Sequence, residues 1–328
     1  MKKKQINWGF IGCGDVTVSK SGPAFRMVEG SNVVAVMSRH ADRAEAYARE
    51  RDIARWYDDA QALIADDEVN AIYVATPPSS HTTYAIMAMK AGKPVYIEKP
   101  MAVSYEECCR INRIADETGT KCFVAYYRRY QPYFLKVKEL LEAERIGKVA
   151  AVQVRYARPP LPQDLDRAVL PWRLQPDIAG GGYFYDLAPH QIDILQELLG
   201  YILEAEGCTA NRAGLYDVED TVTAAFRFDS GVVGSGTWSF AAHETAAEDR
   251  IEIIGDHGKI SFSTFSYEPI SLHTVAVHET FDVGRPNPVQ LPLIRAVVED
   301  LQGGARCSCD GVSATTVNWV LDKIMGKS

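Results

Sequence analysis

Three polar residues have the types and the spacing for chemistry at a hydroxyl or carbonyl oxygen. Lys99 stands just past a short apolar run, and its ammonium group can hydrogen-bond a reacting oxygen. Asp186 and His190 lie four residues apart in a predicted helix, so they share one helix face. A histidine can take a proton near neutral pH, and an aspartate can hold a substrate or tune that base. The structural alternatives are a solvated lysine and an Asp–His pair on a helix surface.

A glycine-rich turn follows the first apolar run of the chain. Its first glycine allows a tight turn, and its second lets the backbone approach a pyrophosphate at the start of a helix. Thr17 stands where the dinucleotide fingerprint has a third glycine or alanine, which predicts looser packing of helix on strand there. The pattern favours dinucleotide binding over an ordinary turn, and the predicted cofactor-binding residues are Gly12, Cys13, Gly14, Asp15 and Val16.

The end of the second apolar run indicates which dinucleotide is bound. An acidic residue there would bind the ribose 2′-hydroxyl of NAD. This chain instead has Ser38 and Arg39, with Arg43 one helical turn later. A hydroxyl and guanidinium groups suit a 2′-phosphate, so the sequence favours NADP over NAD. For Arg43, a solvated position at a helix start is the alternative.

The elements that must position these residues alternate in type through the first third of the chain. Short apolar runs alternate with stretches of helical composition, which predicts a doubly wound parallel sheet of the Rossmann type. The runs are residues 6–11, 32–37, 55–57, 71–75, 95–97 and 122–125.

The pattern changes after about residue 147 into consecutive strands joined by short turns. This predicts an α+β domain with an open, mainly antiparallel sheet. Its expected strands are residues 149–156, 221–228, 232–240, 250–254 and 259–262, with helices at 183–199, 291–301 and 314–325. We therefore expect an α/β protein with a dinucleotide-binding domain at residues 1–125 and a substrate-binding and oligomerisation domain at residues 126–328. Packing of the C-terminal helices on the first domain is the alternative to their packing within the second.

Four motifs in this order give the chain a family resemblance. They are WGFIGCG at residues 8–14, TPPSSH at 76–81, EKP at 98–100 and GGGYFYDLAPH at 180–190. Together they resemble the Gfo/Idh/MocA oxidoreductases over essentially the whole chain. The resemblance implies hydride transfer between NAD(P) and a carbon bearing a hydroxyl or carbonyl group, usually on a sugar, cyclitol or related polyol. It implies Lys99, Asp186 and His190 as catalytic residues, and it adds Thr76, Pro77, His81, Glu98 and Lys99 itself to the cofactor-binding residues.

Other residues are weaker candidates for the substrate site. Tyr127 stands where many relatives carry an amide, which indicates an aromatic or differently shaped substrate wall. Arg128 is expected to reach the site, whereas Arg129 either joins it or pairs locally. Trp172 and Arg173 would stack on a sugar ring and bind its hydroxyl or carboxylate groups, or else pack within their loop. For His81, the alternative is a surface position at the start of a helix.

Composition excludes several other classes of protein. The 328 residues carry a net charge of −8, and their few basic clusters do not form a phosphate-tracking surface, so no nucleic acid partner is expected. The apolar runs are too short to span a membrane, and no signal-peptide core precedes Trp8, so we expect a cytoplasmic protein. The seven cysteines lack zinc-ligand spacing, so no metal is expected.

The expected partners are a small-molecule substrate and further copies of the chain. Residues 221–228 alternate polar and apolar side chains, so one sheet face needs a cover. Trp238 and Phe240 are expected to add aromatic area near that face. A homodimer, or a homotetramer built from dimers, would cover it.

Three other functions fit the same motifs. One is a glycosidase that uses bound NAD to oxidise a sugar transiently. Another is a reductase of a dihydrodiol or a non-sugar carbonyl, which is compatible with Tyr127 in place of the amide that many relatives carry. The third is a non-catalytic regulator that senses dinucleotides. Retention of Lys99, Asp186 and His190 argues against the regulator, which needs none of them.

Overall fold

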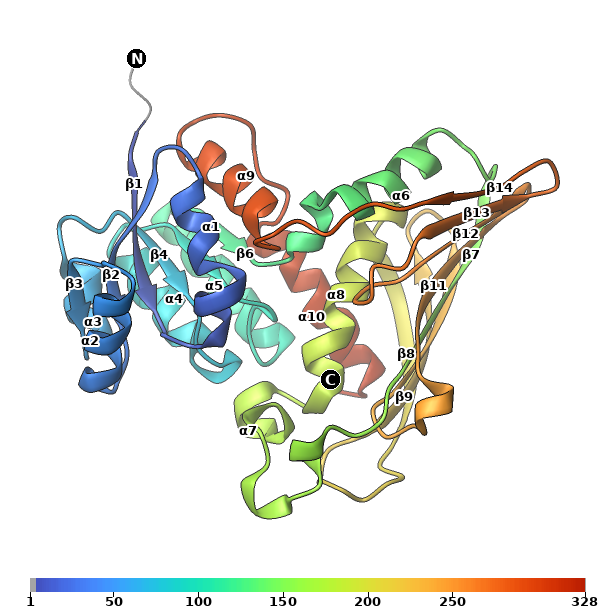
Figure 1. Ribbon diagram of the computed structural model, residues 1–328, viewed down its shortest axis with the longest axis horizontal. Helices are drawn as coiled ribbons and strands as arrows, with labels where there is room; N and C mark the ends of the chain where they lie inside the picture. The colour runs from blue at the N-terminus through green and yellow to red at the C-terminus, as the bar shows by residue number, and fades with distance from the viewer. Residues whose placement is uncertain (1–3, 328) are drawn as a thin grey trace. The chain divides into compact units, whose positions relative to one another are not determined.

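The computed structural model describes residues 4–327, and the chain in it forms two compact units (Figure 1). Unit 1 comprises the residues up to Tyr127 together with Pro286–Thr315. Unit 2 comprises Arg128–Arg285 and the residues from Thr316 onward. This division differs from a single boundary after residue 125, because the segment Pro286–Thr315 groups with the N-terminal residues.

Unit 1 is built on a six-stranded sheet in the order β3-β2-β1-β4-β5-β6. All its strand pairs are parallel, which confirms the doubly wound architecture predicted from the apolar runs. The central strands are buried on both faces, as a sheet covered by helices on both sides requires. The strands are β1 (Ile6–Ile11), β2 (Ser31–Met37), β3 (Arg55–Tyr57), β4 (Ala71–Val74), β5 (Val95–Ile97) and β6 (Cys122–Val124).

Helices connect these strands, and local signals fix their ends. In α5 (Tyr105–Thr118) the Ser104 side chain accepts a hydrogen bond from the backbone of Glu107, and Gly119 ends the helix in the left-handed conformation. The other helices of this unit's N-terminal part are α1 (Gly22–Met27), α2 (Ala41–Glu50), α3 (Ala60–Ala65) and α4 (His81–Lys90).

The segment Pro286–Thr315 completes unit 1. Its helix α9 (Leu291–Leu301) packs beside α1 (Figure 1). Lys121 forms an ion pair with Asp300 on α9. Beyond the helix, the backbone N–H of Val124 donates to the carbonyl of Cys309 at 2.9 Å, so the outer edge of β6 is paired. These contacts are the physical reason that the segment groups with unit 1.

Unit 2 contains an eight-stranded sheet in the order β14-β13-β12-β11-β7-β10-β9-β8. Only β10 and β7 pair in parallel, which confirms the mainly antiparallel prediction. Helices α6 (Pro132–Glu142) and α8 (Gly182–Leu199) lie on one face of this sheet (Figure 1). The strands are β7 (Val149–Ala157), β8 (Ile202–Ala210), β9 (Thr221–Phe228), β10 (Val233–Ser239), β11 (Glu248–Gly255), β12 (Gly258–Phe262), β13 (Ile270–Thr274) and β14 (His278–Phe281).

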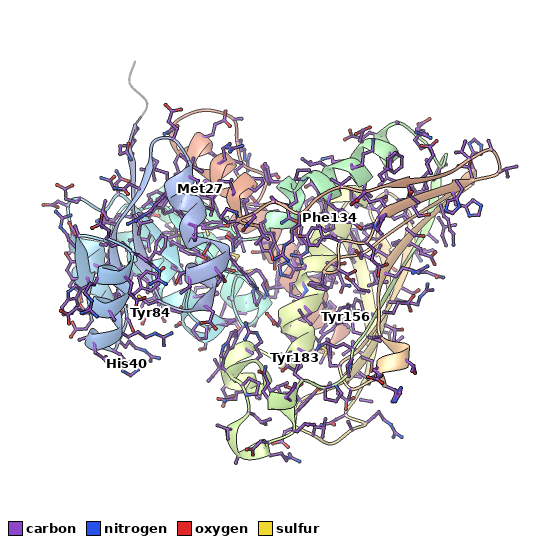
Figure 2. The ribbon with its side chains drawn as sticks, in the orientation of Figure 1. Met27, His40, Tyr84, Phe134, Tyr156 and Tyr183 are labelled. Atoms are coloured by element: carbon purple, nitrogen blue, oxygen red, sulfur yellow. The ribbon has the colours of Figure 1, made fainter. Side chains whose placement is uncertain are left out.

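Trp238 and Phe240 belong to the buried core of unit 2, so their expected place near the outer sheet face is wrong. Trp238 pairs directly with Val222 across the antiparallel β9–β10 ladder, and directly opposed residues share a face. Its indole N–H donates to Gln191 Oε1 of α8 at 2.6 Å. Phe240 packs with Tyr156 and Tyr183, which Figure 2 labels.

The opposite face of the same ladder carries small and charged side chains. Thr223, Ala225 and Arg227 are exposed and alternate with buried neighbours along β9. The alternation predicted for residues 221–228 is therefore present. The last helix, α10 (Gly311–Ile324), contains the boundary between the two units. No helix within residues 4–327 has the length and apolar character needed to cross a membrane.

Candidate active site

The glycine-rich turn lies between the ends of three parallel strands of unit 1. The N–H of Gly12 donates to the carbonyl of Met37 at the end of β2, at 2.9 Å. Gly12 has a φ of +111°, and a Cβ there would stand 2.8 Å from the carbonyl oxygen of Ala75, just past β4. Gly12 is therefore required by its backbone conformation and by its neighbours. A Cβ on Gly14, in contrast, would meet nothing within 4 Å.

At Thr17, where the dinucleotide fingerprint has glycine or alanine, the chain adopts an irregular turn. Thr17 is buried, and its hydroxyl donates to the carbonyl of Gly14 at 2.7 Å. The chain then makes a wide π-helical turn, η1 (Val16–Lys20), before α1 begins at Gly22. The Tyr47 hydroxyl donates to the carbonyl of Thr17 at 3.0 Å and holds this turn against α2.

Arg43 braces the glycine-rich turn. Its Nη2 donates to the carbonyl of Cys13 at 3.0 Å, so this guanidinium is not merely solvated at a helix start. Burial raises the pKa of the Cys13 thiol to about 11, against the opposing charges of Arg43 and Arg51. The thiol is therefore protonated at neutral pH. Arg39, by contrast, is exposed beyond the end of β2, where Ser38 Oγ accepts from the N–H of His40.

His81 is a buried brace between two strand-end turns. It is fully buried, so its surface alternative is wrong. Its Nε2 lies 2.7 Å from the carbonyl of Thr76, after β4, and its Nδ1 lies 3.0 Å from the carbonyl of Pro100, after β5. Burial lowers the pKa of His81, while these carbonyls and Glu98 oppose that shift. His81 therefore links the Thr76–Pro77 turn to the turn that carries Lys99.

Glu98 anchors the backbone of Lys99. Its carboxylate is buried, and Oε1 accepts from the Tyr73 hydroxyl at 2.6 Å and from Gln290 Nε2 at 2.7 Å. The Lys99 N–H donates to its Oε2 at 3.2 Å. Gln290 also accepts from the Tyr96 hydroxyl at 2.8 Å, so the network runs from β4 and β5 to the segment before α9. These contacts fix where Lys99 leaves β5.

In unit 2, α8 carries a line of titratable residues along one face. Asp186, His190, Asp193 and Glu197 recur at spacings of four, three and four residues, which keeps them on one side of a helix. Each has a partner from another element of the unit.

Trp172 and Arg173 meet the first residue of this line. The Arg173 Nε donates to Asp186 Oδ2 at 2.9 Å. The Arg173 guanidinium also lies over the Trp172 ring at 4.5 Å. The structure therefore brings three of the candidate residues together. Trp172 and Arg173 lie in the irregular stretch before the triple glycine, and Asp186 lies on α8, the helix after it.

Arg128 meets the second residue, His190. Its Nη1 lies 3.3 Å from His190 Nδ1, and its Nε donates to the carbonyl of Thr264 at 3.1 Å. Phe265 stacks its ring 4.8 Å from the Arg128 guanidinium and contacts the His190 ring edge-on at 5.9 Å between centroids. Thr264 and Phe265 were not among the predicted residues. They lie in the turn after β12, where backbone N–H groups donate to Asp249.

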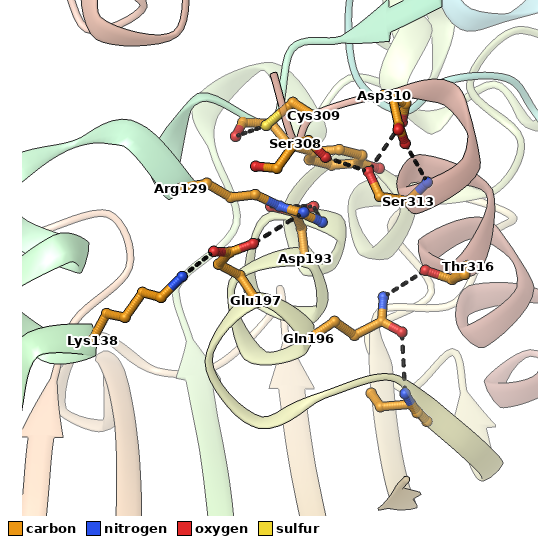
Figure 3. Close-up of polar contacts among 12 residues, drawn as sticks. Arg129, Lys138, Asp193, Gln196, Glu197, Ser308, Cys309, Asp310, Ser313 and Thr316 are labelled. Carbon is orange, nitrogen blue, oxygen red and sulfur yellow. Dashed lines mark hydrogen bonds and ion pairs between the residues drawn. The ribbon is translucent and has the colours of Figure 1, made fainter. Parts of the chain in front are cut away.

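Arg129 meets the third and fourth residues of the line, as Figure 3 shows. Its Nε and Nη2 donate to Asp193, with the shortest contact at 2.6 Å, and its Nη1 donates to Glu197 at 3.2 Å. Lys138 of α6 also donates to Glu197 at 2.6 Å. Burial raises the pKa of Asp193 to about 6, although Arg129 opposes the shift. Arg129 thus pairs within unit 2, as one of its two alternatives predicted.

The remaining candidates divide between the units. Tyr127 is buried and is the last N-terminal residue of unit 1. Lys99 and the cofactor candidates belong to unit 1, whereas Asp186, His190, Arg128, Trp172 and Arg173 belong to unit 2. Within the described part of the chain, no group of three His, Cys, Asp or Glu side chains could hold a metal ion.

Comparison with known proteins gives matches along the whole chain. Residues 6–126 match the family model described as an oxidoreductase family with an NAD-binding Rossmann fold, and residues 134–261 match the GFO/IDH/MocA C-terminal domain.

Three similar proteins cover between 78% and 99% of the chain. Oxidoreductase P35 of Formosa agariphila is 37% identical over 326 residues, which is 99% of each chain. Inositol 2-dehydrogenase 2 of Saccharopolyspora erythraea is 32% identical over 78% of this chain and 73% of its own. Among solved structures, levoglucosan dehydrogenase in complex with NADH has a TM-score of 0.88 at 23% identity and covers 99% of this chain and 97% of its own.

Proposed function

Because the chain belongs to the Gfo/Idh/MocA family of oxidoreductases, we propose that it is a dehydrogenase or reductase of a sugar, polyol or related small molecule. The reaction interconverts a hydroxyl-bearing carbon and a carbonyl carbon. One observation carries the proposal: Glu98, itself held by Tyr73 and Gln290, fixes Lys99 at the end of β5, in the same sheet edge as the glycine-rich turn. Ligands of open parallel sheets bind at the carboxyl ends of the strands.

The residues present fit a dinucleotide. Gly14 leaves the backbone open where a pyrophosphate would approach, and Gly12 holds the turn against β2 and β4. In this proposal the residues that hold the pyrophosphate are Gly12, Cys13, Gly14, Asp15 and Val16. When bound, the nicotinamide supplies or accepts the hydride. Thr76 and Pro77, with His81 behind them, would border the nicotinamide end.

NADP is the proposed cofactor in preference to NAD. β2 ends without an acidic residue, and Ser38 and Arg39 follow it. The exposed Arg39 guanidinium is available for a bidentate contact with a 2′-phosphate. Arg43 would contribute its positive charge while it braces the carbonyl of Cys13.

Lys99, Asp186 and His190 are proposed to act on the reacting oxygen of the substrate. A positive charge near that oxygen stabilises the alkoxide that develops during hydride transfer. Lys99 supplies this charge, and Asp186 and His190 supply polar contacts from α8. Trp172 and Arg173 would form a substrate wall, since an indole face suits a sugar ring and the guanidinium suits its oxygen atoms. Tyr127 is proposed as a further wall residue.

The names of similar proteins support the substrate class. They include an inositol dehydrogenase, a 1,5-anhydro-D-fructose reductase and a levoglucosan dehydrogenase. A screen of NADP+ and NAD+ reduction against sugars, polyols and sugar acids, with the reverse reaction on the matching carbonyl compounds, tests the proposal. We expect turnover with at least one compound and its loss in Lys99→Ala. Sugar release without net cofactor reduction would identify a glycosidase instead, and cofactor binding without any turnover would favour a regulator.

We propose further that the protein is a cytoplasmic homodimer or homotetramer. The exposed face of β9, with Thr223 and Ala225, offers small side chains on one side of the sheet. All seven cysteines lie within the described residues as thiols outside any disulfide, which suits a reducing compartment. Light scattering should give a mass of two or four chains at micromolar concentration, and a mass of one chain would refute the assembly.

A further inference from the structure

The contact between Arg128 and His190 determines which nitrogen of the histidine can carry a proton. Arg128 is almost fully buried, and its guanidinium contacts the carbonyl of Thr264, the ring of Phe265 and His190 Nδ1. A guanidinium has donor hydrogens and no acceptor. At 3.3 Å, His190 Nδ1 must therefore accept from Arg128 Nη1.

This geometry selects one form of the imidazole. A neutral histidine has one N–H donor and one acceptor nitrogen, so an accepting Nδ1 leaves the proton on Nε2. A doubly protonated ring would point an N–H at the guanidinium and place two cations together. The Arg128 contact therefore opposes proton uptake at Nδ1.

We infer that Arg128 is a positioning residue that holds His190 as the Nε2–H tautomer, so that His190 donates a hydrogen bond to the reacting oxygen rather than taking its proton. The inference rests on the proposed function and changes the role that the sequence favoured for His190. Arg128 accordingly acts through His190, whereas the sequence placed it as a direct substrate contact.

The proton must then go elsewhere. In the oxidation direction the carbinol carbon loses a hydride, which a bound nicotinamide would accept, and the hydroxyl proton passes to Lys99 Nζ, which then carries the positive charge beside the oxygen. Reduction reverses both transfers, with the Lys99 ammonium giving the proton to the new hydroxyl. Asp186 is the weaker acceptor, because its carboxylate already accepts from Arg173 at 2.9 Å. In both directions His190 keeps its Nε2 proton and stabilises charge on the oxygen.

The charged groups around His190 come from several elements. Asp186 and Asp193 precede and follow it by about one turn on α8. Arg128 and Arg129 approach from η3 (Tyr127–Tyr130), and Asp249 of β11 holds the loop that carries Phe265. Asp193 is bound by Arg129, so it does not compete with Arg128 for the histidine.

Two-bond proton–nitrogen correlation spectra of isotope-labelled histidine test the tautomer without any substrate. The chain has seven histidines, and loss of one signal set in His190→Gln assigns the ring. We expect a neutral ring protonated on Nε2 at neutral pH. In Arg128→Gln, whose amide can donate or accept, both tautomers should become populated. Arg212→Gln, at an exposed arginine of the same unit, should leave the spectrum unchanged. A wild-type ring protonated on Nδ1, or on both nitrogens, would overturn the inference.

A kinetic comparison tests the donor role once a substrate is found. Glutamine offers an amide N–H but cannot take a proton. His190→Gln should therefore keep kcat within about 10-fold of the wild type, whereas His190→Ala should lose roughly 100-fold. The pH profile of kcat should keep its shape in His190→Gln. Equal losses in the two variants, together with a flattened pH profile, would make His190 the base. If no compound is turned over, the proposed function fails while the spectra still decide the tautomer.

Discussion

A pair of glycine-to-alanine substitutions separates the folding role of the glycine-rich turn from its binding role. In Gly12→Ala the new Cβ would stand 2.8 Å from the Ala75 carbonyl oxygen at a φ of +111°. The left-handed backbone costs about 1–2 kcal/mol for an L-residue, and overpacking adds about 1–3 kcal/mol. We expect a loss of roughly 2–5 kcal/mol, a large share of the ~5–15 kcal/mol by which domains are stable.

Gly14→Ala is the matched control, because its Cβ would meet nothing within 4 Å. Its free energy of unfolding should stay within about 1 kcal/mol of the wild type, with any change on the stabilising side. If the pyrophosphate lies over this residue, the methyl group should raise the Kd for NADPH by about 10- to 100-fold, or roughly 1.4–2.8 kcal/mol.

Urea unfolding without cofactor and fluorescence titration with NADPH measure the two effects. The reasoning fails if Gly14→Ala is as unstable as Gly12→Ala, since the space beside Gly14 would then not exist. It fails equally if Gly14→Ala binds NADPH as tightly as the wild type, since the pyrophosphate would then lie elsewhere.

Three further predictions concern single side chains. Arg39→Glu should raise the Kd for NADPH at least 10-fold more than that for NADH, and equal losses would contradict the NADP preference. Gln290→Ala should cost about 1–3 kcal/mol in urea unfolding, because Glu98 loses a buried donor; an unchanged midpoint would refute the anchoring network. Burial raises the pKa of Asp193 to about 6, so the folded state binds this proton more tightly than the unfolded chain. Its stabilising contribution is complete below the unfolded pKa of 3.8 and is lost as pH rises through about 6. From about pH 4.5 to about pH 7, the wild-type Tm should therefore fall relative to that of Asp193→Asn, and a constant difference would contradict the shift.

Much of the fold follows from local sequence signals. The parallel strands of unit 1 are continuous apolar runs, and α9 has the bounds of the helix predicted at residues 291–301. Strands β8, β13 and β14 escaped prediction. β13 is short and buries only Ile270 and Leu272, whereas β8 and β14 are edge strands, which bury few side chains. In β8 only Ile202 is buried, so no apolar run marks it. The side on which Trp238 lies depends on its pairing with Val222, which composition does not encode.

The candidate site was predicted as a set of residues, and its supporting contacts were not. The sequence singles out Arg128 and His190 but not the 3.3 Å contact between them, because 62 residues separate the two. Phe265 carries no motif, and its place beside both side chains depends on how Asp249 folds the turn after β12. Gln290 reaches Glu98 across a separation of 192 residues. Such partners arise from tertiary folding alone.

The route of the chain through its two units has a consequence for biosynthesis. A ribosome synthesises all of Arg128–Arg285 before it makes Pro286–Thr315, the segment that completes unit 1. Until Gln290 and Cys309 emerge, Glu98 has the Tyr73 hydroxyl but lacks its second buried donor, Gln290, and the edge of β6 is open to pairing with another chain. A nascent chain that ends near residue 127 is therefore an incomplete domain and not a small independent one, and unit 1 matures only during the last stage of synthesis.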